Sequence, residues 1–280
     1  MELFGDPAAM RAWSRGRRAG GATLALVPTM GALHAGHLAL VDEARRRATA
    51  VIVSIFVNPI QFDRTSDFDR YPRAFDDDLA ACRAAGVHAV YAPTATSMYP
   101  RGFQTRVVPG ALADSLEGEM RPGHFEGVTT VVTKLLAATV PDIALFGQKD
   151  YQQLAIVRRM VADLDLGVEI VAVPTSREVD GLARSSRNVR LSVDDRVAAV
   201  VIPEALRAAA DAYTAGERDA ARLRALAAEH IEREPRAKAE YVAVVDAATL
   251  EPLTMVDRPA VLLTAVWFGD VRLIDNQLLG

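Results

Sequence analysis

Two kinds of apolar pattern alternate along the first 175 residues of the chain. Unbroken apolar runs of strand length, rich in β-branched residues, are separated by segments of helical character. The predicted strands are residues 23–27, 51–57, 87–93, 142–147 and 167–174, and the predicted helices are residues 37–48, 127–140 and 150–164. Strands that are apolar throughout, joined by crossover helices, are typical of a parallel sheet buried on both faces. We therefore expect a doubly wound α/β domain, in which ligands bind at the carboxyl ends of the strands.

The segment 150–164 shows the helical spacing most clearly. Leu154, Val157, Val161 and Leu164 follow one another at steps of three and four residues. This spacing predicts one apolar helical stripe.

The pattern changes after Pro174. Residues 175–188 are too polar and irregular to belong to a core, so we place a linker there. The sequence therefore predicts two domains, residues 1–175 and residues 176–280.

The second domain combines helical and strand patterns. Two alanine-rich segments, residues 194–213 and 217–232, are expected to be helical, and Pro203 is expected to break the first of them. Two apolar runs follow, residues 241–250 and 260–275, and predict a pair of strands. Helices followed by strands indicate a smaller α+β domain.

Composition narrows the class of protein. The 280 residues are half apolar and carry a formal charge of −4, and the basic runs at 15–18 and 45–47 are too short for a nucleic-acid-binding face. No apolar stretch approaches the roughly 18 residues of a membrane span, and the N-terminus lacks the apolar run of a signal peptide. The single cysteine, Cys82, cannot form an internal disulfide. We therefore expect a soluble, cytoplasmic protein with neither nucleic acid nor membrane as partner.

The first predicted strand runs into the sequence PTMGALHAGH, residues 28–37. His34 and His37 stand three residues apart at the start of the next helix, a spacing that puts them on one face. Gly31 and Gly36 let the backbone approach a ligand, and the helix N-terminus supplies unpaired N–H groups and a positive dipole end. The alternative is that both histidines only cap or pack the helix. Their place after a buried strand and between glycines favours a phosphate-binding loop with imidazole donors.

The second strand is followed by uncharged polar groups in the sequence FVNPIQF. Asn58 and Gln61 lie in an apolar setting, and buried amides need hydrogen-bond partners, which a hydroxylated ligand would provide. Capping of the turn by Asn58 is an equally good explanation. Further on, MRPGHFEGV joins Arg121 and His124 through a Pro-Gly turn; an arginine there either binds a carboxylate or phosphate or meets only water.

The strand at 142–147 ends in FGQKDYQQL. Lys149 follows closely after Gly147 and is a candidate phosphate ligand. Asp150 is placed to cap the following helix, and Gln153, on its first turn, is a second candidate reader of hydroxyl groups.

The predicted linker ends in GLARSSRN, which supplies two hydroxyl and two guanidinium groups from Arg184, Ser185, Ser186 and Arg187. Such a loop suits closure over a polyphosphate, whose charge shifts during transfer. A solvated linker is the simpler alternative.

Two other features have structural explanations. Asp76, Asp77 and Asp78 fit the acidic first turn of a helix better than a metal site, and we predict no metal ligands from the protein. Trp267 and Phe268 lie in a strand-like run and are expected in the core.

Six motifs, taken together and in order, resemble those of the pantothenate synthetase family, the pantoate–β-alanine ligases. These motifs are PTMGALHAGH, SIFVNPIQF, YPR, MRPGHFEGVTTVV, FGQKDYQQL and DGLARSSRN, and the resemblance covers most of the chain. It implies a Rossmann-like sheet of the nucleotidyltransferase type that carries a His-x-Gly-His motif, with a smaller C-terminal lid domain and a homodimer. It also implies a two-step reaction, in which pantoate and Mg²⁺-ATP give pantoyl adenylate, and β-alanine then yields pantothenate and AMP.

The resemblance also implies roles for residues at the matching positions. Catalytic roles fall on His34, His37, Lys149 and Arg187. ATP contacts are implied for Met30, His34, His37, Gly147, Lys149, Asp150, Ser176, Arg184, Ser185, Ser186 and Arg187. Pantoate contacts are implied for Gln61 and Gln153, with Asn58, Tyr71 and Arg121 as further members of the pocket.

The last motif departs from the family pattern, which has methionine where this chain has Arg184 and an aromatic pair position where it has Val189 and Arg190. Two other functions compete with the ligase. The first is a cytidylyl- or adenylyltransferase acting on a phosphorylated alcohol or mononucleotide, which would not need the paired glutamines Gln61 and Gln153. The second is a nucleotide-binding regulatory protein without catalytic activity, which only the change of methionine to Arg184 suggests.

Overall fold

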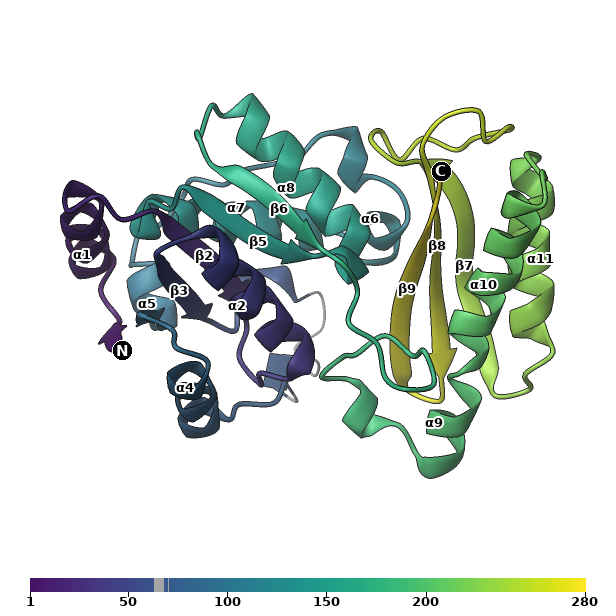
Figure 1. Ribbon diagram of the computed structural model, residues 1–280, viewed down its shortest axis with the longest axis horizontal. Helices are drawn as coiled ribbons and strands as arrows, with labels where there is room; N and C mark the ends of the chain where they lie inside the picture. The colour runs from purple at the N-terminus through teal and green to yellow at the C-terminus, as the bar shows by residue number, and fades with distance from the viewer. Residues whose placement is uncertain (63–67, 70) are drawn as a thin grey trace. The chain divides into compact units, whose positions relative to one another are not determined.

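The computed structural model describes residues 1–62, 68–69 and 71–280 (Figure 1). Backbone contacts divide the chain into two compact units. The first contains residues 1–148 and 152–174, and the second contains residues 149–151 and 175–280. The domain boundary expected after residue 175 stays a prediction, and each unit is described by itself below.

The first unit is built on a six-stranded sheet in which all neighbouring strands are parallel. Its strands are β1 (Glu2–Phe4), β2 (Leu24–Thr29), β3 (Ala50–Ile55), β4 (Ala89–Tyr91), β5 (Ile143–Gly147) and β6 (Glu169–Val173). Their order in the sheet is β1-β4-β3-β2-β5-β6. The doubly wound parallel sheet predicted from the sequence is therefore confirmed. The order reverses between β2 and β5, and in such sheets ligands bind outside the carboxyl ends of the strands at this point.

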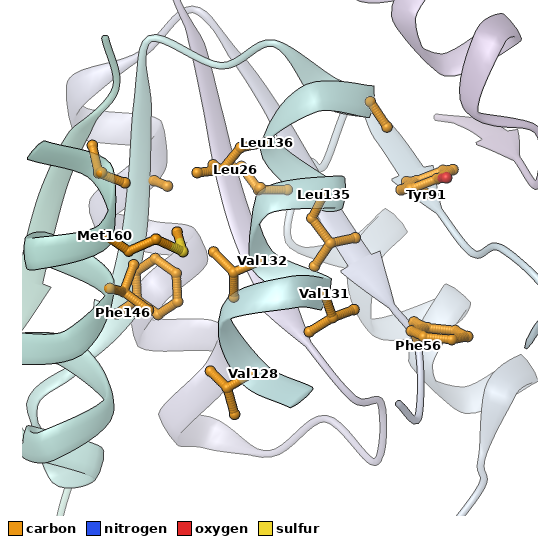
Figure 2. Close-up of a cluster of buried hydrophobic side chains, with 14 of the residues drawn as sticks. Leu26, Phe56, Tyr91, Val128, Val131, Val132, Leu135, Leu136, Phe146 and Met160 are labelled. Atoms are coloured by element: carbon orange, nitrogen blue, oxygen red, sulfur yellow. The ribbon is translucent and has the colours of Figure 1, made fainter. Parts of the chain in front are cut away.

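Helices cover both faces of this sheet because successive strand residues point to opposite faces. One hydrophobic cluster joins Leu26, Ile52 and Phe146 to helices α1 (Pro7–Ala19), α7 (His124–Thr139) and α8 (Tyr151–Asp163). The alternate strand residues pack with α2 (Ala35–Arg47) and α4 (Phe75–Ala84) in a second cluster. Figure 2 shows the first cluster, in which valines and leucines of α7 lie beside Leu26 and Phe146. The other short elements among the described residues are η1 (Pro59–Gln61), α5 (Ala95–Met98), η2 (Ala111–Ala113), α6 (Glu117–Met120) and η3 (Gln148–Asp150).

Two details of the first unit differ from the sequence-based expectations. The strand β1 and the helix α1 were not predicted, because β1 has three residues and α1 is rich in arginine. In the stripe on α8, Leu154, Val157 and Val161 are buried as expected, but the prediction for Leu164 was wrong. Leu164 is 45% exposed because the helix ends at Asp163 and the chain turns away from the stripe.

The second unit consists of helices beside a three-stranded antiparallel sheet in the order β7-β8-β9. Its elements are η4 (Asn188–Arg190), α9 (Val193–Ala198), α10 (Val201–Thr214), α11 (Ala220–Glu232), β7 (Ala237–Asp246), β8 (Ala260–Phe268) and β9 (Val271–Leu279). The helices and the sheet share one hydrophobic cluster of their own. The predicted α+β composition is confirmed.

Three expectations for this unit need correction. The second apolar run is a hairpin rather than one strand, because Gly269 adopts a left-handed φ of 57° and turns the chain into β9. The helical break falls before Pro203, which lies in the first turn of α10, where its missing N–H is not needed. Phe268 is in the core, but Trp267 is only half-buried, since its indole N–H donates to Glu240 Oε1 (2.9 Å).

Among the helices of the described residues, none combines the length and the apolar character needed to cross a membrane.

Candidate functional site

The loop between β2 and α2 forms the centre of the candidate site. Thr29, the last residue of β2, accepts the Gly31 N–H at its hydroxyl (3.1 Å). Gly31 has a φ of 85°, and a Cβ there would lie 2.9 Å from a carboxylate oxygen of Asp78, so only glycine fits this turn. The loop delivers the chain to His34, which is the N-cap of α2.

His34 and His37 form a capping box from imidazole rings. The Gly36 N–H donates to His34 Nδ1 (3.1 Å), and the His34 N–H donates to His37 Nδ1 (3.3 Å). The rings lie against each other, with centroids 4.1 Å apart. Because both Nδ1 atoms accept hydrogen bonds, each neutral ring carries its proton on Nε2. Capping and ligand binding are thus compatible, since Nε2 of each ring is the donor that a phosphate oxygen requires.

Asp78 holds this loop in place, although the sequence interpretation assigned it only to an acidic helix turn. The residue does lie in the first turn of α4, but its side chain is 3% exposed. Its carboxylate accepts the N–H groups of Ala32 (2.9 Å) and Leu33 (2.7 Å). Ala32 has a φ of 50°, which is uncommon for a residue with a side chain. Asp78 therefore stabilises a strained turn directly before His34.

The amides of Asn58 and Gln61 lie buried next to the same loop. Asn58 is 1% exposed and Gln61 is 8% exposed. The Asn58 amide donates to Gln61 Oε1 (3.0 Å), and the Gln61 amide in turn donates to Met30 Sδ (3.3 Å). The structure thus brings together the predicted residues Met30, Asn58 and Gln61, and it adds Tyr99, whose hydroxyl donates to Asn58 Oδ1 (2.7 Å).

Arg121, which ends α6, and His124, the first residue of α7, approach Gln61. His124 Nδ1 lies 2.8 Å from the carbonyl oxygen of Gln61, and an Arg121 guanidinium N–H donates to the same oxygen (3.4 Å). The helix can approach so closely because residue 127 is glycine, and a Cβ there would lie 2.6 Å from Gln61 Cα. Tyr71 is half-buried, with its ring centroid 5.9 Å from that of Phe62.

The segment after β5 belongs partly to each unit. Gly147 is the last residue of β5, at the carboxyl end of the sheet beside the point where the strand order reverses. Gln153 lies on the first turn of α8, as expected. Lys149 and Asp150 lie in η3, and the carbonyl oxygen of Lys149 accepts a hydrogen bond from Asn276 Nδ2 on β9 (3.0 Å).

The polar loop at residues 175–188 is anchored within the second unit. Arg177 donates two hydrogen bonds to the carboxylate of Asp275, which is buried (2.6 and 3.0 Å). The Arg184 N–H donates to the Ser176 carbonyl oxygen (2.9 Å), and the Arg184 guanidinium pairs with Glu178 (2.9 Å).

The other predicted members of this loop lie at its end. Ser185 Oγ accepts the Arg187 N–H (3.2 Å), and Ser186 is half-buried between them. The loop is therefore held by contacts within itself and by the pairing of Arg177 with Asp275 on β9. The roles of Ser185, Ser186 and Arg187 toward a ligand stay predictions.

Sequence reasoning missed Asp78 and Tyr99 for the same reason. Their partners lie 45 and 46 residues away for Asp78 and 41 residues away for Tyr99, and no local pattern reports such pairs. The run of three aspartates marked the helix turn, but it did not show that only the third one, Asp78, is buried against the loop. Burial raises the pKa of the Tyr99 hydroxyl, so this group stays a hydrogen-bond donor at neutral pH.

Within residues 1–62, 68–69 and 71–280, no group of three or more His, Cys, Asp or Glu side chains is arranged to hold a metal ion. The groups that the site offers an anionic ligand are imidazole and amide N–H groups, the N-terminus of α2 and the guanidinium of Arg121. Such donors suit phosphate and carboxylate oxygens.

Known proteins share this sequence and fold along nearly the whole chain. A family model described as pantoate-beta-alanine ligase matches residues 2–278. Pantothenate synthetases from Pelotomaculum thermopropionicum and Chloroflexus aurantiacus are 48% and 54% identical, over 97% and 95% of this chain and 96% and 95% of the relatives. The crystal structure of pantothenate synthetase from Thermus thermophilus matches with a TM-score of 0.93 and 45% identity, covering 99% of both chains. The pantoate-beta-alanine ligase from Francisella tularensis, complexed with beta-gamma ATP and beta-alanine, matches with a TM-score of 0.79 and 33% identity, covering 99% of this chain and 97% of that one.

Proposed function

Because the chain belongs to the pantoate–β-alanine ligase family, we propose that it condenses pantoate with β-alanine at the expense of ATP. The reaction has two steps. In the first, a carboxylate oxygen of pantoate attacks the α-phosphorus of ATP, and pyrophosphate leaves with the electron pair of the broken P–O bond. In the second, the amine of β-alanine attacks the carbonyl carbon of pantoyl adenylate, loses a proton and expels AMP.

Neither step requires a nucleophile from the protein, so positioning and charge stabilisation carry the catalysis. His34, His37 and the N-terminus of α2 would bind phosphate oxygens and stabilise the charge that develops on the leaving pyrophosphate. Lys149 and Arg187 would supply positive charge to the same phosphates. Further ATP contacts are proposed for Met30, Gly147, Asp150, Ser176, Arg184, Ser185 and Ser186.

The pantoate pocket would be formed by amides. Gln61 and Gln153 would bind the hydroxyl and carboxylate oxygens of pantoate, with Asn58, Tyr71 and Arg121 around them. Buried amides suit a hydroxy acid because an apolar competitor would leave them without partners.

One observation carries the proposal. The amide nitrogen of Gln61 lies 3.3 Å from Met30 Sδ, on the loop that leads from β2 to the two histidines. A donor for a hydroxy acid and a phosphate-binding helix start thus share one short loop. Transfer of an adenylyl group to a carboxylate needs this adjacency, because the two reacting groups must meet in line.

The setting of the reaction is also part of the proposal. Mg²⁺ would arrive with ATP as its counter-ion and neutralise phosphate charge. We further propose that the protein acts in the cytoplasm as a homodimer, and sedimentation of the purified chain tests the second of these statements.

Product formation by the purified protein tests the function directly. The protein is incubated with Mg²⁺-ATP, pantoate and β-alanine, each omitted in turn, while pyrophosphate and AMP are followed separately. We expect pyrophosphate to appear with ATP and pantoate alone, and AMP to be released only after β-alanine is added. Joint release of both products only in the presence of β-alanine would contradict a separate adenylation step.

The variant His37→Ala tests the assigned phosphate site. We expect pyrophosphate release in a single turnover to slow by at least about 100-fold, because a donor to the developing charge is lost. His230→Ala is the matched control, because it removes another imidazole, from the last turn of α11, and leaves the loop between β2 and α2 unchanged. Unchanged pyrophosphate release by His37→Ala would remove this residue from the mechanism.

A further inference from the structure

The hydrogen bonds from Tyr99 to Met30 run in one direction only. Asn58 Nδ2 lies 3.1 Å from the carbonyl oxygen of Gly127, which can only accept. The side-chain atom at this position must therefore be the nitrogen, and the opposite atom must be Oδ1. The Tyr99 hydroxyl, 2.7 Å from Oδ1, is consequently a donor.

The direction continues into Gln61. The second hydrogen of Asn58 Nδ2 points to Gln61 Oε1 (3.0 Å), so the Gln61 oxygen faces Asn58 and its nitrogen faces Met30. A thioether sulfur is a weak acceptor. An oxygen of a ligand would therefore replace Met30 Sδ at Gln61 Nε2 with a gain in hydrogen-bond strength.

From this arrangement we propose that Tyr99 is a positioning residue for the hydroxy-acid site: its hydroxyl locks the Asn58 amide, and Asn58 thereby fixes Gln61 with its N–H groups toward the ligand. The inference rests on the proposed function, because it takes pantoate as the ligand of Gln61. It assigns to Gln61 the role of a donor, which selects an acceptor oxygen in the ligand.

Packing keeps Tyr99 suitable for this task. Its ring packs against those of Phe103 and Phe56, with centroids at 5.0 and 6.2 Å, and its backbone N–H, at the end of α5, donates to the carbonyl oxygen of Ala95 (2.8 Å). These aromatic contacts favour one position of the ring and therefore of its hydroxyl. Without the Tyr99 hydroxyl, the Asn58 amide would keep its hydrogen bond to the Gly127 carbonyl oxygen, but its buried Oδ1 would lose its donor. Rotation of the amide would not repair this loss, because it would turn Oδ1 toward the Gly127 carbonyl oxygen.

The variant Tyr99→Phe removes the hydroxyl and keeps the ring. We expect the KM for pantoate to rise about tenfold, as for the loss of one donor to a buried amide, while the KM for ATP changes less than about twofold. Tyr91→Phe is the matched control, because Tyr91 is a buried tyrosine of the hydrophobic cluster against which Tyr99 packs. Thermal unfolding of each variant establishes that it is folded.

A double-mutant cycle separates positioning from simple packing. Because Tyr99 is proposed to act through Gln61, Tyr99→Phe should have little effect on pantoate binding in a Gln61→Ala background. If turnover in that background is too slow for kinetics, calorimetry measures the pantoate affinity. Asn58→Asp gives an independent check, since a carboxylate has no N–H to donate to Gly127 or Gln61, and it should raise the pantoate KM at least as much.

Three results would overturn the inference. Folded Tyr99→Phe with wild-type KM values would show that the hydroxyl is not needed, and equal tenfold effects in both backgrounds would show that it acts without Gln61. Equal losses for ATP and pantoate would indicate a general structural role. If the wild-type protein makes no pantothenate in the same assay, the proposed function itself fails, and this outcome is distinct from the other three.

Discussion

A single carboxylate can decide the shape of a binding loop, and Asp78 is such a residue. It accepts two consecutive backbone N–H groups of a turn in which Gly31 and Ala32 both have positive φ. A carboxylate is suited to this because both its oxygens are acceptors, whereas an amide has only one. The loop conformation before His34 therefore depends on a residue from another helix.

Replacement of Asp78 by Asn keeps the size of the side chain but turns an NH₂ group toward one backbone N–H. We expect the free energy of unfolding to fall by about 1–3 kcal/mol, the cost of a buried donor left unpaired. The KM for ATP should rise, because the histidines are displaced. Urea unfolding and steady-state kinetics measure the two effects.

Asp77→Asn is the control for this prediction, since Asp77 is exposed on the same helical turn. Both variants remove one negative charge near the N-terminus of α4. Equal losses of stability in the two variants would mean that Asp78 stabilises the protein through the dipole of α4 and not through its hydrogen bonds to the loop.

At the scale of elements, the close approach of α7 to η1 shapes the amide pocket. The helix presents Gly127 to the backbone of Ile60 and Gln61, where a Cβ would lie 2.6 Å from the carbonyl oxygen of Ile60. Gly127→Ala must therefore push the two elements apart. We expect a loss of about 1–3 kcal/mol of stability, as for overpacking elsewhere, together with a raised KM for pantoate.

Gly16→Ala provides the matching substitution in a helix without a neighbour. Gly16 lies in α1, and nothing lies within 4 Å of the position that a Cβ would take there. Alanine there should stabilise the protein by roughly 0.5–1 kcal/mol, because it lowers the entropy of the unfolded chain. If Gly127→Ala raised the unfolding temperature as well, the close packing of α7 on η1 would be contradicted.

The turn after β7 gives the second unit a pH-dependent contribution to stability. Asp246 accepts the N–H groups of Ala248 and Thr249 (both 2.8 Å) and pairs with Arg258 (2.7 Å). Its bonds to Thr249 and Arg258 lower the pKa of this carboxyl to about 2. Since the folded pKa lies below the unfolded value of about 3.9, the stabilisation is complete above pH 4 and is lost as the pH falls toward 2.

Asp246→Asn should therefore be less stable than the wild type at pH 7, and the difference should shrink between about pH 4 and pH 2. Urea unfolding at several pH values measures it, followed by the fluorescence of Trp267 in a Trp13→Phe background, because Trp13 in the first unit would otherwise contribute to the signal. Asp257→Asn is the control, because Asp257 pairs with the same arginine but is exposed. A difference that stays constant down to pH 2 would contradict the assigned pKa.

For the molecule as a whole, the sequence predicted what depends on local pattern. Apolar runs and helical spacing gave the parallel sheet, and the glycine and histidine spacing of residues 31–37 gave the loop at its carboxyl edge. The hairpin at Gly269 was not predicted, because the turn lies within one long apolar run. The roles of Tyr99 and Asp78 were not predicted, because their partners are distant in sequence and meet them only in the fold.

The lone cysteine offers a test of the hydroxy-acid site that needs no turnover. Cys82 is fully buried in the cluster shared by α2, α4 and the sheet, and burial raises the pKa of its thiol to about 11. A thiol reagent at pH 8 should therefore label Cys82 only when the first unit opens. In mild urea, where reclosing outpaces labelling, the rate is proportional to the population of the open state.

Pantoate binds, in our proposal, through Gln61 and Gln153, which both belong to this unit. A ligand that binds only the folded state, present at 100 times its Kd, stabilises that state by about 2.7 kcal/mol. We therefore expect pantoate alone to slow the labelling of Cys82 about 100-fold, and Gln61→Ala to abolish this protection at the same concentration. Labelling that pantoate leaves unchanged in the wild type would contradict binding of pantoate to the folded first unit, because a ligand bound there must oppose its unfolding.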